Sequence, residues 1–285
     1  MLQWQVGEVR ITRVVELGQI PTSPRFFFKE APDDLVARHG WLKPHFARDD
    51  GKLLMSIHCF VIETQGKRIV VDTCIGNDKK RKYPGWNELS GPFLDDLKKA
   101  GFATRDIDYV LCTHLHVDHV GWNTRLVDGV WLPTFEAARY LFARTEWEHW
   151  STSNESGYGG DDLLGDSVRP IINAGLADLV DTHHKITDEV WLEPTPGHTP
   201  GHVSVRIESK GQRAVITGDL MHHPIQCSEP DLPVSFDSDT TMAISTRRNF
   251  LGCCARDQVL VLGTHFANPT AGHVVAEGTA WKFKV

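Results

Sequence analysis

One short segment, Thr113–Gly121, constrains this chain more than any other part of its sequence. It holds four potential metal ligands within six residues: His114, His116, Asp118 and His119. The segment follows an apolar stretch, residues 107–113, that predicts a strand, so the four side chains gather where that strand ends. Alternate residues of an extended backbone share one side, which lets His114 and His116 reach one ion while the other two turn elsewhere. Imidazole and carboxylate suit zinc, iron or manganese, and the lack of thiolate argues against a structural zinc knot.

Three further segments place a potential ligand at the end of an apolar stretch. Residues 194–202 form a turn rich in Pro and Gly that presents His198, residues 216–219 end in Asp219, and residues 262–265 end in His265. Each segment alone is a weak signal. Together with the first they supply five histidines and two aspartates from four strand ends, enough ligands for two metal ions.

Composition narrows the class of protein. The 285 residues include 30 Lys and Arg, 37 Asp and Glu, and 15 His, for a formal net charge of −7. With 41% hydrophobic and 24% charged residues, the chain is too apolar for disorder and too charged for a membrane bundle. A negative net charge argues against a nucleic-acid partner, because phosphate recognition requires a basic surface. The high histidine content favours metal binding and acid–base chemistry as functions.

The N-terminus and the cysteines indicate the compartment. Residues 1–8 lack the basic and apolar regions of a signal peptide, and no run approaches the roughly 18 apolar residues of a membrane span. The six cysteines show no zinc-binding spacing and are best interpreted as free thiols. We therefore expect a cytoplasmic protein with no membrane partner.

Strand-like and helix-like segments mix along the whole chain, which predicts an α/β or α+β protein. No linker composition divides it, so we expect one domain over residues 1–285, with an N-terminal strand and aromatic arm (1–50) and a catalytic core (51–285). The periodicity predicts strands at 8–16, 53–63, 68–72, 107–113, 189–193, 202–208, 213–218 and 258–263. It predicts helices near 32–39, 92–100, 135–143 and 238–254, and a polar, Gly-rich loop at 145–165.

On these residues the chain resembles the metallo-β-lactamase superfamily. The HxHxDH signature of that superfamily stands here as His114, His116, Asp118 and His119, and its later ligands match His198, Asp219 and His265. The resemblance covers residues 53–273. It implies a four-layer αββα sandwich with the metals at one edge of the two sheets.

The resemblance also implies a site. One metal would be held by His114, His116 and His198, the other by Asp118, His119 and His265, and Asp219 would bridge them. Asp72 would orient a ligand, and His202 is expected to support the site rather than to bind metal. The cofactor would be two divalent ions, zinc first, with manganese, iron or cobalt as alternatives. A water shared by two such ions is a hydroxide at neutral pH, which would attack an ester carbonyl.

Within the superfamily the chain resembles the branch of N-acyl-homoserine lactonases and methyl parathion hydrolases. That branch implies hydrolysis of a small-molecule ester, foremost a lactone, with organophosphotriesters as further substrates. β-Lactamase or thioesterase activity on the same site stays open. An iron-dependent oxidoreductase of the sulfur dioxygenase kind is the alternative of another class, and metal analysis separates it because that branch uses one iron.

One departure from the lactonases concerns the residues after Asp219. Homoserine lactonases place a tyrosine there to hydrogen-bond the substrate, whereas this chain has Leu220-Met221-His222-His223. His222 is the candidate for contact with the substrate or for protonation of the leaving group, and a supporting role is its alternative. We expect four aromatic side chains to wall the substrate pocket, with core packing or a homodimer interface as the alternatives: Phe27, Trp41, Trp122 and Trp147.

Overall fold

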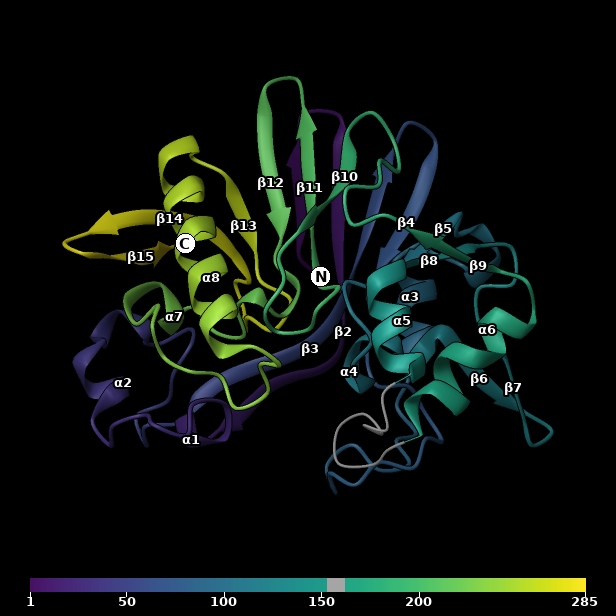
Figure 1. The fold of residues 1–285 in the computed structure, drawn as a ribbon, viewed down its shortest axis with the longest axis horizontal. Helices are drawn as coiled ribbons and strands as arrows, with labels where there is room; N and C mark the ends of the chain where they lie inside the picture. The colour runs from purple at the N-terminus through teal and green to yellow at the C-terminus, as the bar shows by residue number, and fades with distance from the viewer. Residues whose placement is uncertain (153–161) are drawn as a thin grey trace.

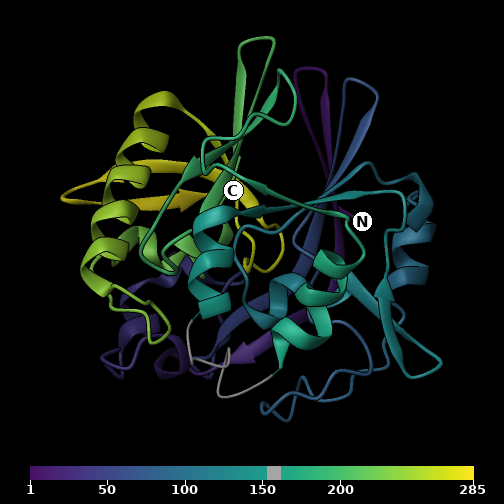
Figure 2. The ribbon, with the colours of Figure 1, turned by 45° about the vertical axis from the view of Figure 1, so that its right-hand side comes forward.

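Two mixed β-sheets pack face to face, and helices cover the outer face of each sheet in the computed structural model of the chain (Figure 1, Figure 2). The structure describes residues 1–152 and 162–285. The first sheet has the strand order β1-β2-β3-β4-β5-β8-β9, and the second has the order β10-β11-β12-β13-β14-β15. This helix–sheet–sheet–helix layering confirms the four-layer αββα sandwich predicted from the sequence.

Thirteen strands make up the two large sheets of the described residues. The first sheet contains β1 (Gln3–Val6), β2 (Val9–Thr22), β3 (Leu53–Thr64), β4 (Lys67–Val71), β5 (Tyr109–Leu111), β8 (Arg139–Ala143) and β9 (Ala177–Val180). The second contains β10 (Val190–Pro194), β11 (Val203–Ser209), β12 (Gln212–Ile216), β13 (Leu260–Leu262), β14 (Ala271–Glu277) and β15 (Ala280–Lys284). A separate hairpin consists of β6 (Thr124–Val127) and β7 (Val130–Pro133).

The helices are mostly short, with one exception. They are α1 (Pro24–Phe27), α2 (Leu35–Arg38), α3 (Phe93–Lys99), α4 (Val117–Val120), α5 (Arg144–Thr152), α6 (Arg169–Asn173), α7 (Ile225–Ser228) and α8 (Thr240–Asp257). The predictions near 92–100 and 238–254 are confirmed by α3 and α8. Asp239 caps α8 by accepting a hydrogen bond from the Met242 N–H, which satisfies a backbone donor of the first turn. Among the described residues, no helix is long and apolar enough to cross a membrane.

Apolar side chains fill the three spaces between the four layers. Side chains from both sheets, such as Phe60 and Val205, form the middle cluster. A second cluster lies between the first sheet and α3, which contributes Phe93, and a third lies between the second sheet and α8, which contributes Leu251. Burial on both faces explains why the inner strands are almost continuously apolar rather than alternating.

The prediction of a helix at 135–143 is wrong, because residues 139–143 form strand β8. The residues are good helix formers by composition, yet β8 pairs in parallel with β5 on one side and with β9 on the other. Its residues 140–143 are all buried, as expected for a central parallel strand. Pairing with two neighbouring strands therefore overrides the local helix propensity.

The prediction of a loop at 145–165 is also wrong in part, because residues 144–152 form helix α5. Glu146 and Trp150 lie one turn apart on one face of that helix and are both buried. Residues 164–168 form a π-helical turn, η5 (Leu164–Val168). Residues 153–161 of the predicted loop lie outside the described residues.

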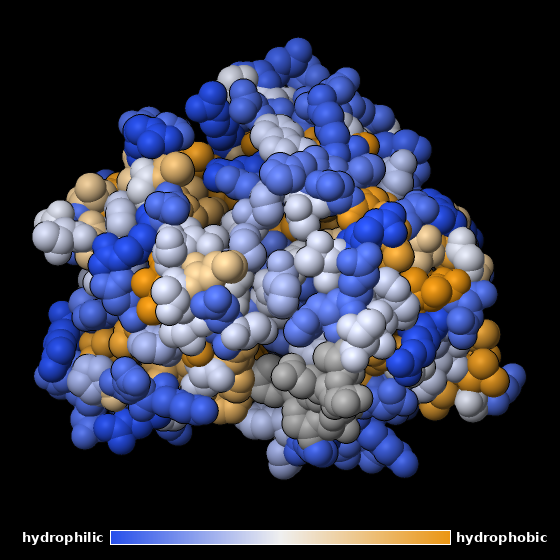
Figure 3. Space-filling model, in the orientation of Figure 1, coloured by the Kyte–Doolittle hydropathy of each residue, from blue (hydrophilic) through white to orange (hydrophobic). Residues whose placement is uncertain are grey.

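Buried charges fix the long connection between β4 and α3, residues 72–92. Arg81 donates two hydrogen bonds to the carboxylate of Asp166 in η5, over 2.6 and 3.1 Å. The Lys79 Nζ donates to Thr124 Oγ1 and to the Asp166 carbonyl, and it lies 3.7 Å from the centre of the Trp131 ring. The connection is thereby tied to η5 and to the β6–β7 hairpin, whose exposed apolar side chains are visible at the lower right of Figure 3.

Candidate metal centre

Seven potential ligands converge where the ends of strands from both sheets meet. His114 and His116 follow β5, His198 lies in the turn between β10 and β11, and Asp219 and His265 follow β12 and β13. Single ligand atoms of His114, His116, His198 and Asp219 all lie within 4.8 Å of one another, and we call these residues the first cluster. The corresponding atoms of Asp118, His119 and His265 meet the same limit and form the second cluster. The structure therefore brings together all seven residues that the sequence singled out.

Hydrogen bonds orient His114, His119, His198 and His265. Each Nδ1 faces an acceptor: Thr113 Oγ1 at 3.0 Å for His114, Asp72 Oδ2 at 3.0 Å for His119, Asp237 Oδ1 at 3.0 Å for His198 and the Ser56 carbonyl at 3.1 Å for His265. Donation from Nδ1 places the proton on that nitrogen and leaves the lone pair on Nε2. The Nε2 atoms of all four rings therefore point inward as potential ligands.

The inward nitrogens lie close enough together to share a cation. His116 Nδ1 is 3.0 Å from His114 Nε2 and 3.0 Å from His198 Nε2. His119 Nε2 and His265 Nε2 approach to 3.3 Å. Lone pairs on buried nitrogens at this spacing repel one another unless a proton or a metal ion lies between them. The donor set, imidazole nitrogen with carboxylate oxygen, fits a divalent transition metal in each cluster.

Asp219 faces both clusters with one carboxylate oxygen each. Its Oδ2 lies 3.7 Å from His114 Nε2 and 3.4 Å from His198 Nε2. Its Oδ1 lies 3.3 Å from His119 Nε2 and 3.1 Å from His265 Nε2. Each carboxylate oxygen of Asp219 therefore faces the histidines of one cluster.

The protonation states also suit metal binding. Burial holds the pKa values of His114, His116 and His198 well below the ordinary range, so these rings are neutral at pH 7. Burial alone would raise the pKa of Asp219, but the neighbouring His119 and His265 outweigh it and hold that pKa well below its usual range. The neutral forms of these three rings and the ionised form of Asp219 are the forms in which these groups bind a cation.

Asp72 and His202 each contact ligand residues, as their predicted supporting roles require. Asp72 accepts hydrogen bonds from the backbone N–H and the hydroxyl of Thr113, at 2.7 and 3.0 Å, besides facing His119. His202 accepts the backbone N–H of Asp219 at Nε2 over 2.8 Å and donates from Nδ1 to the Thr195 carbonyl over 3.1 Å. Burial lowers the pKa of His202 to about 3, so the ring is neutral and keeps this acceptor.

A cavity opens onto the two clusters and is mostly apolar. Its lining includes Ile20, Phe26, Phe27, Met55, Ile57, Tyr83, Trp86, His222 and Phe236, together with five of the potential ligands. The ring of His222 lies 5.3 Å from that of Phe27, and its Nε2 lies 3.2 Å from Asp219 Oδ2. His222 Nδ1 is buried without a hydrogen-bond partner among the described residues. An apolar wall beside polar ligands is typical of a small-molecule site.

Three of the four aromatic side chains expected in the pocket lie elsewhere. Trp122 is buried, stacks on Phe93 and donates from Nε1 to Glu16 over 2.6 Å. Trp41 packs against the cluster beneath α8, and Trp147 packs against the cluster beneath α3. Of these four residues, only Phe27 is among the described residues that line the cavity. The cavity is lined instead by Tyr83, Trp86 and Phe236. These residues lie in loops, and only tertiary contacts bring those loops to the site.

Three carboxylates that accept hydrogen bonds were not predicted from the sequence, and two of them, Asp237 and Glu146, contact the loops that carry ligands. Asp237 contacts His198, as described above. Glu146 accepts hydrogen bonds from the Leu115 and Gly201 N–H groups, and Glu16 accepts them from Ile75 and Gly76. Burial raises the pKa of Glu16 to about 6. The sequence carries no signal for these residues, because each is one acidic residue in an ordinary helix, strand or loop.

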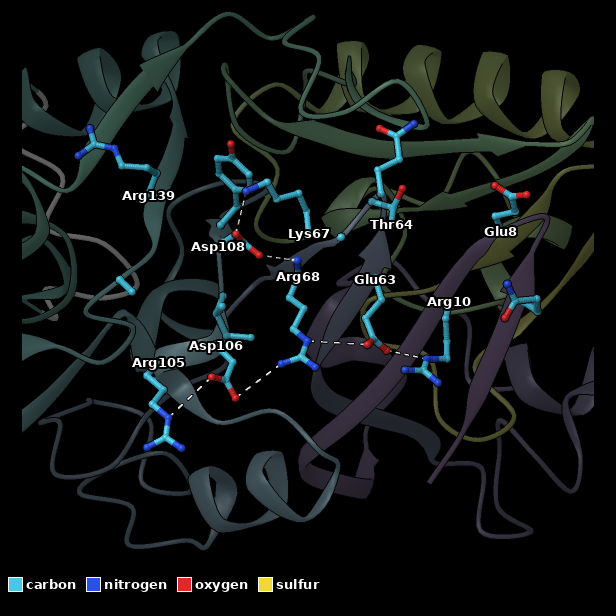
Figure 4. Close-up of a pocket in the computed structure, with 16 residues that line it drawn as sticks. Glu8, Arg10, Glu63, Thr64, Lys67, Arg68, Arg105, Asp106, Asp108 and Arg139 are labelled. Carbon is cyan, nitrogen blue, oxygen red and sulfur yellow. Dashed lines mark hydrogen bonds and ion pairs between the residues drawn. The ribbon is translucent and has the colours of Figure 1, made fainter.

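A broad hollow of about 1010 Å³ lies at the opposite ends of the same strands. Its charged side chains pair in a row across the strands, as Figure 4 shows for Arg10 with Glu63, Glu63 with Arg68 and Arg68 with Asp106. β4 begins beside this hollow and ends near the metal centre, which places the two about 13 Å apart at the rise of a strand. These side chains are partly exposed and pair with one another, and such surface ion pairs contribute little to stability.

Comparison with known proteins identifies a family and several relatives. A family model described as the metallo-beta-lactamase superfamily matches residues 54–253. An N-acyl homoserine lactonase of Bacillus sp is 25% identical over 230 residues, which cover 75% of this chain and 83% of that protein. An N-acyl homoserine lactonase of Bacillus thuringiensis is 23% identical over 228 residues, with the same coverage of 75% and 83%.

Solved structures show the same fold. A hydrolase described as AbOPH in the beta lactamase superfamily superposes with a TM-score of 0.80 at 24% identity, covering 99% of this chain and 95% of that one. AidC, described as a dizinc quorum-quenching lactonase in complex with a product, superposes with a TM-score of 0.77 at 22% identity, covering 99% and 96%.

Proposed function

Because the chain belongs to the metallo-beta-lactamase superfamily and is a metal-dependent hydrolase, we propose that it uses two divalent ions to open small-molecule esters, foremost lactones. The observation that carries the proposal is the position of Asp219, whose two oxygens face two separate groups of inward-pointing histidines. A site with one ion would need only one such group. Zinc is the metal that we propose first, since the set of nitrogen and oxygen donors suits it.

The residues divide between the two ions. His114, His116 and His198 would hold one, Asp118, His119 and His265 the other, and Asp219 would contact both. When bound, two such ions supply Lewis-acid polarisation of a carbonyl and a water of lowered pKa. Asp72 and Asp237 keep His119 and His198 in the tautomer that presents Nε2 to the ion.

We propose that His222 acts on the substrate. It lines the cavity beside Asp219, at the position after the strand where homoserine lactonases are expected to carry a tyrosine. A ring nitrogen there can donate a hydrogen bond to the substrate carbonyl or a proton to the leaving oxygen. Its Nδ1, which is buried without a described partner, is the atom on which a substrate group would complete the hydrogen bonding.

The apolar cavity supports a substrate with an apolar group next to the reacting ester. Phe26, Phe27 and Phe236 form one wall, and their rings lie 5.1 to 5.9 Å apart. The curated relatives named as N-acyl homoserine lactonases agree with such a substrate. Burial of an acyl chain against these rings would contribute about 0.8 kcal/mol per methylene.

A hydrolysis panel on the metal-reconstituted protein tests this function. We expect lactones to be hydrolysed with a higher kcat/KM than β-lactams, thioesters or phosphotriesters, and metal analysis to find about two ions per chain. Equal or higher kcat/KM for another ester class would replace the lactone assignment. One redox-active iron per chain without hydrolysis would instead support the oxidoreductase alternative.

Replacement of His222 tests its role separately. In His222→Ala we expect kcat for the best lactone to fall about 100-fold, the scale of a lost general acid or donor, while metal content is retained. His222→Gln should recover part of the loss if a hydrogen bond suffices, because the amide still donates. His183→Ala, at an exposed histidine, is the control. A kcat unchanged in His222→Ala would assign this ring a supporting role only.

A further inference from the structure

One buried side chain on α5, the carboxylate of Glu146, contacts both loops that carry the histidines of the first cluster. Its Oε1 accepts the backbone N–H of Leu115 over 3.1 Å, and its Oε2 accepts the backbone N–H of Gly201 over 2.9 Å. The Trp150 Nε1–H donates to Oε1 over 2.7 Å. The residue is 1% exposed, so water does not compete for these hydrogen bonds.

The two loops belong to different sheets. Leu115 lies between His114 and His116 at the end of β5 in the first sheet, and Gly201 follows His198 in the turn between β10 and β11 of the second. The rings of His116 and His198 nevertheless meet at 3.0 Å between nitrogens. Their spacing therefore depends on whatever holds one loop against the other.

The turn that contains Gly201 packs tightly against α5. A Cβ atom at Gly201 would lie 2.3 Å from the Glu146 backbone nitrogen, so only glycine lets the turn approach α5 this far. Trp150, which donates to the same carboxylate, also packs edge-on against the His116 ring, with ring centres 5.4 Å apart. Glu146 thus contacts residues that neighbour the potential ligands on both loops.

We propose that Glu146 is a positioning residue that sets the distance between His116 and His198 by accepting one backbone hydrogen bond from each ligand loop. This rests on the metal site proposed above. The second cluster is held by other groups, Asp72 and the Ser56 carbonyl, so the effect of Glu146 falls on one ion only. Partners of this kind alter metal affinity by about 10- to 100-fold when removed.

The test is the metal binding of Glu146→Gln. The amide keeps the shape of the side chain but turns one acceptor into a donor that faces a backbone N–H. Titration with Zn²⁺ against a competing chelator should show one ion bound as in the parent and the other bound about 10- to 100-fold more weakly. Glu148→Gln makes the same substitution at an exposed position of the same helix and should leave both affinities unchanged.

The parent protein separates failure of this proposal from failure of the proposed function. If the parent binds no second ion, the two-ion function is wrong and the role of Glu146 falls with it. If the parent binds two ions and Glu146→Gln binds both equally well, only the role of Glu146 is wrong. Should Glu146→Gln not fold, Glu146→Asp keeps the charge but is one methylene shorter, so it cannot reach both backbone N–H groups and must show the same selective loss. Failure of both variants to fold would assign Glu146 to the core and overturn the proposal.

Discussion

Replacing Asp219 by alanine should abolish ester hydrolysis and lower the metal content of the protein. The carboxylate is buried, and it is the group with one oxygen toward each histidine cluster. Its loss leaves both clusters short of an anionic ligand, so both ions should bind more weakly. We expect kcat/KM to fall by at least about 10³-fold, the scale of losing a directly acting group. Metal analysis and a lactone assay on the same preparation measure the two effects together.

Two comparisons make this result specific. Asp219→Asn keeps the size of the side chain and removes the charge, so it should lose most of the activity if charge is what matters. Asp188→Ala removes an aspartate whose side chain is 83% exposed and should leave activity and metal content unchanged. Full activity in Asp219→Ala with two ions retained would show that Asp219 is not a shared ligand.

Replacing Asp166 by alanine should lower the free energy of unfolding by about 3–5 kcal/mol. The Arg81 and Lys79 side chains have no exposed surface and lie 2.6 and 3.5 Å from the Asp166 carboxylate. Removing it leaves two buried positive groups without their counter-ion. Burial already lowers the pKa of Lys79 to about 7, so this side chain loses its proton more readily than an ordinary lysine. Urea denaturation followed by circular dichroism at neutral pH measures the change.

A surface pair on the first sheet provides the matched control. Arg139 and Asp178 form a similar two-bonded contact, but their side chains are 40% and 44% exposed. Asp178→Ala should cost less than about 1 kcal/mol. An equally small loss in Asp166→Ala would mean that the buried charges near η5 do not hold the connection at residues 72–92.

The stability contributed by Asp166 should also depend on pH. Burial alone would raise the pKa of this carboxyl, but the hydrogen bonds from Arg81 outweigh it and hold the pKa below its usual range. A lowered pKa in the folded state means that the unfolded chain binds a proton more readily. The contribution is therefore complete at neutral pH and is lost as the pH falls through the acidic range. Unfolding of the parent and of Asp166→Ala should converge at low pH.

The metal ligands could be predicted because each follows a segment whose local pattern is clear. An apolar stretch predicts a strand, and a ligand directly after it lies at the end of that strand whatever the rest of the fold does. The groups that orient these ligands could not be predicted in the same way. Asp237 lies 39 residues after His198, and Gly201 lies 55 residues after Glu146, so each contact forms only when distant segments pack.

The sequence by itself thus determined the seven candidate ligands and the class of chemistry they support, through short-range patterns in which residue type and spacing are sufficient. The layered fold followed from the resemblance of those residues to the superfamily. Only the tertiary structure decided that residues 139–143 form a strand, that Tyr83 and Trp86 rather than Trp41 and Trp147 face the cavity, and that Glu146 joins two ligand loops. Those outcomes depend on burial and pairing between segments far apart in the chain, where local propensity is too weak to decide.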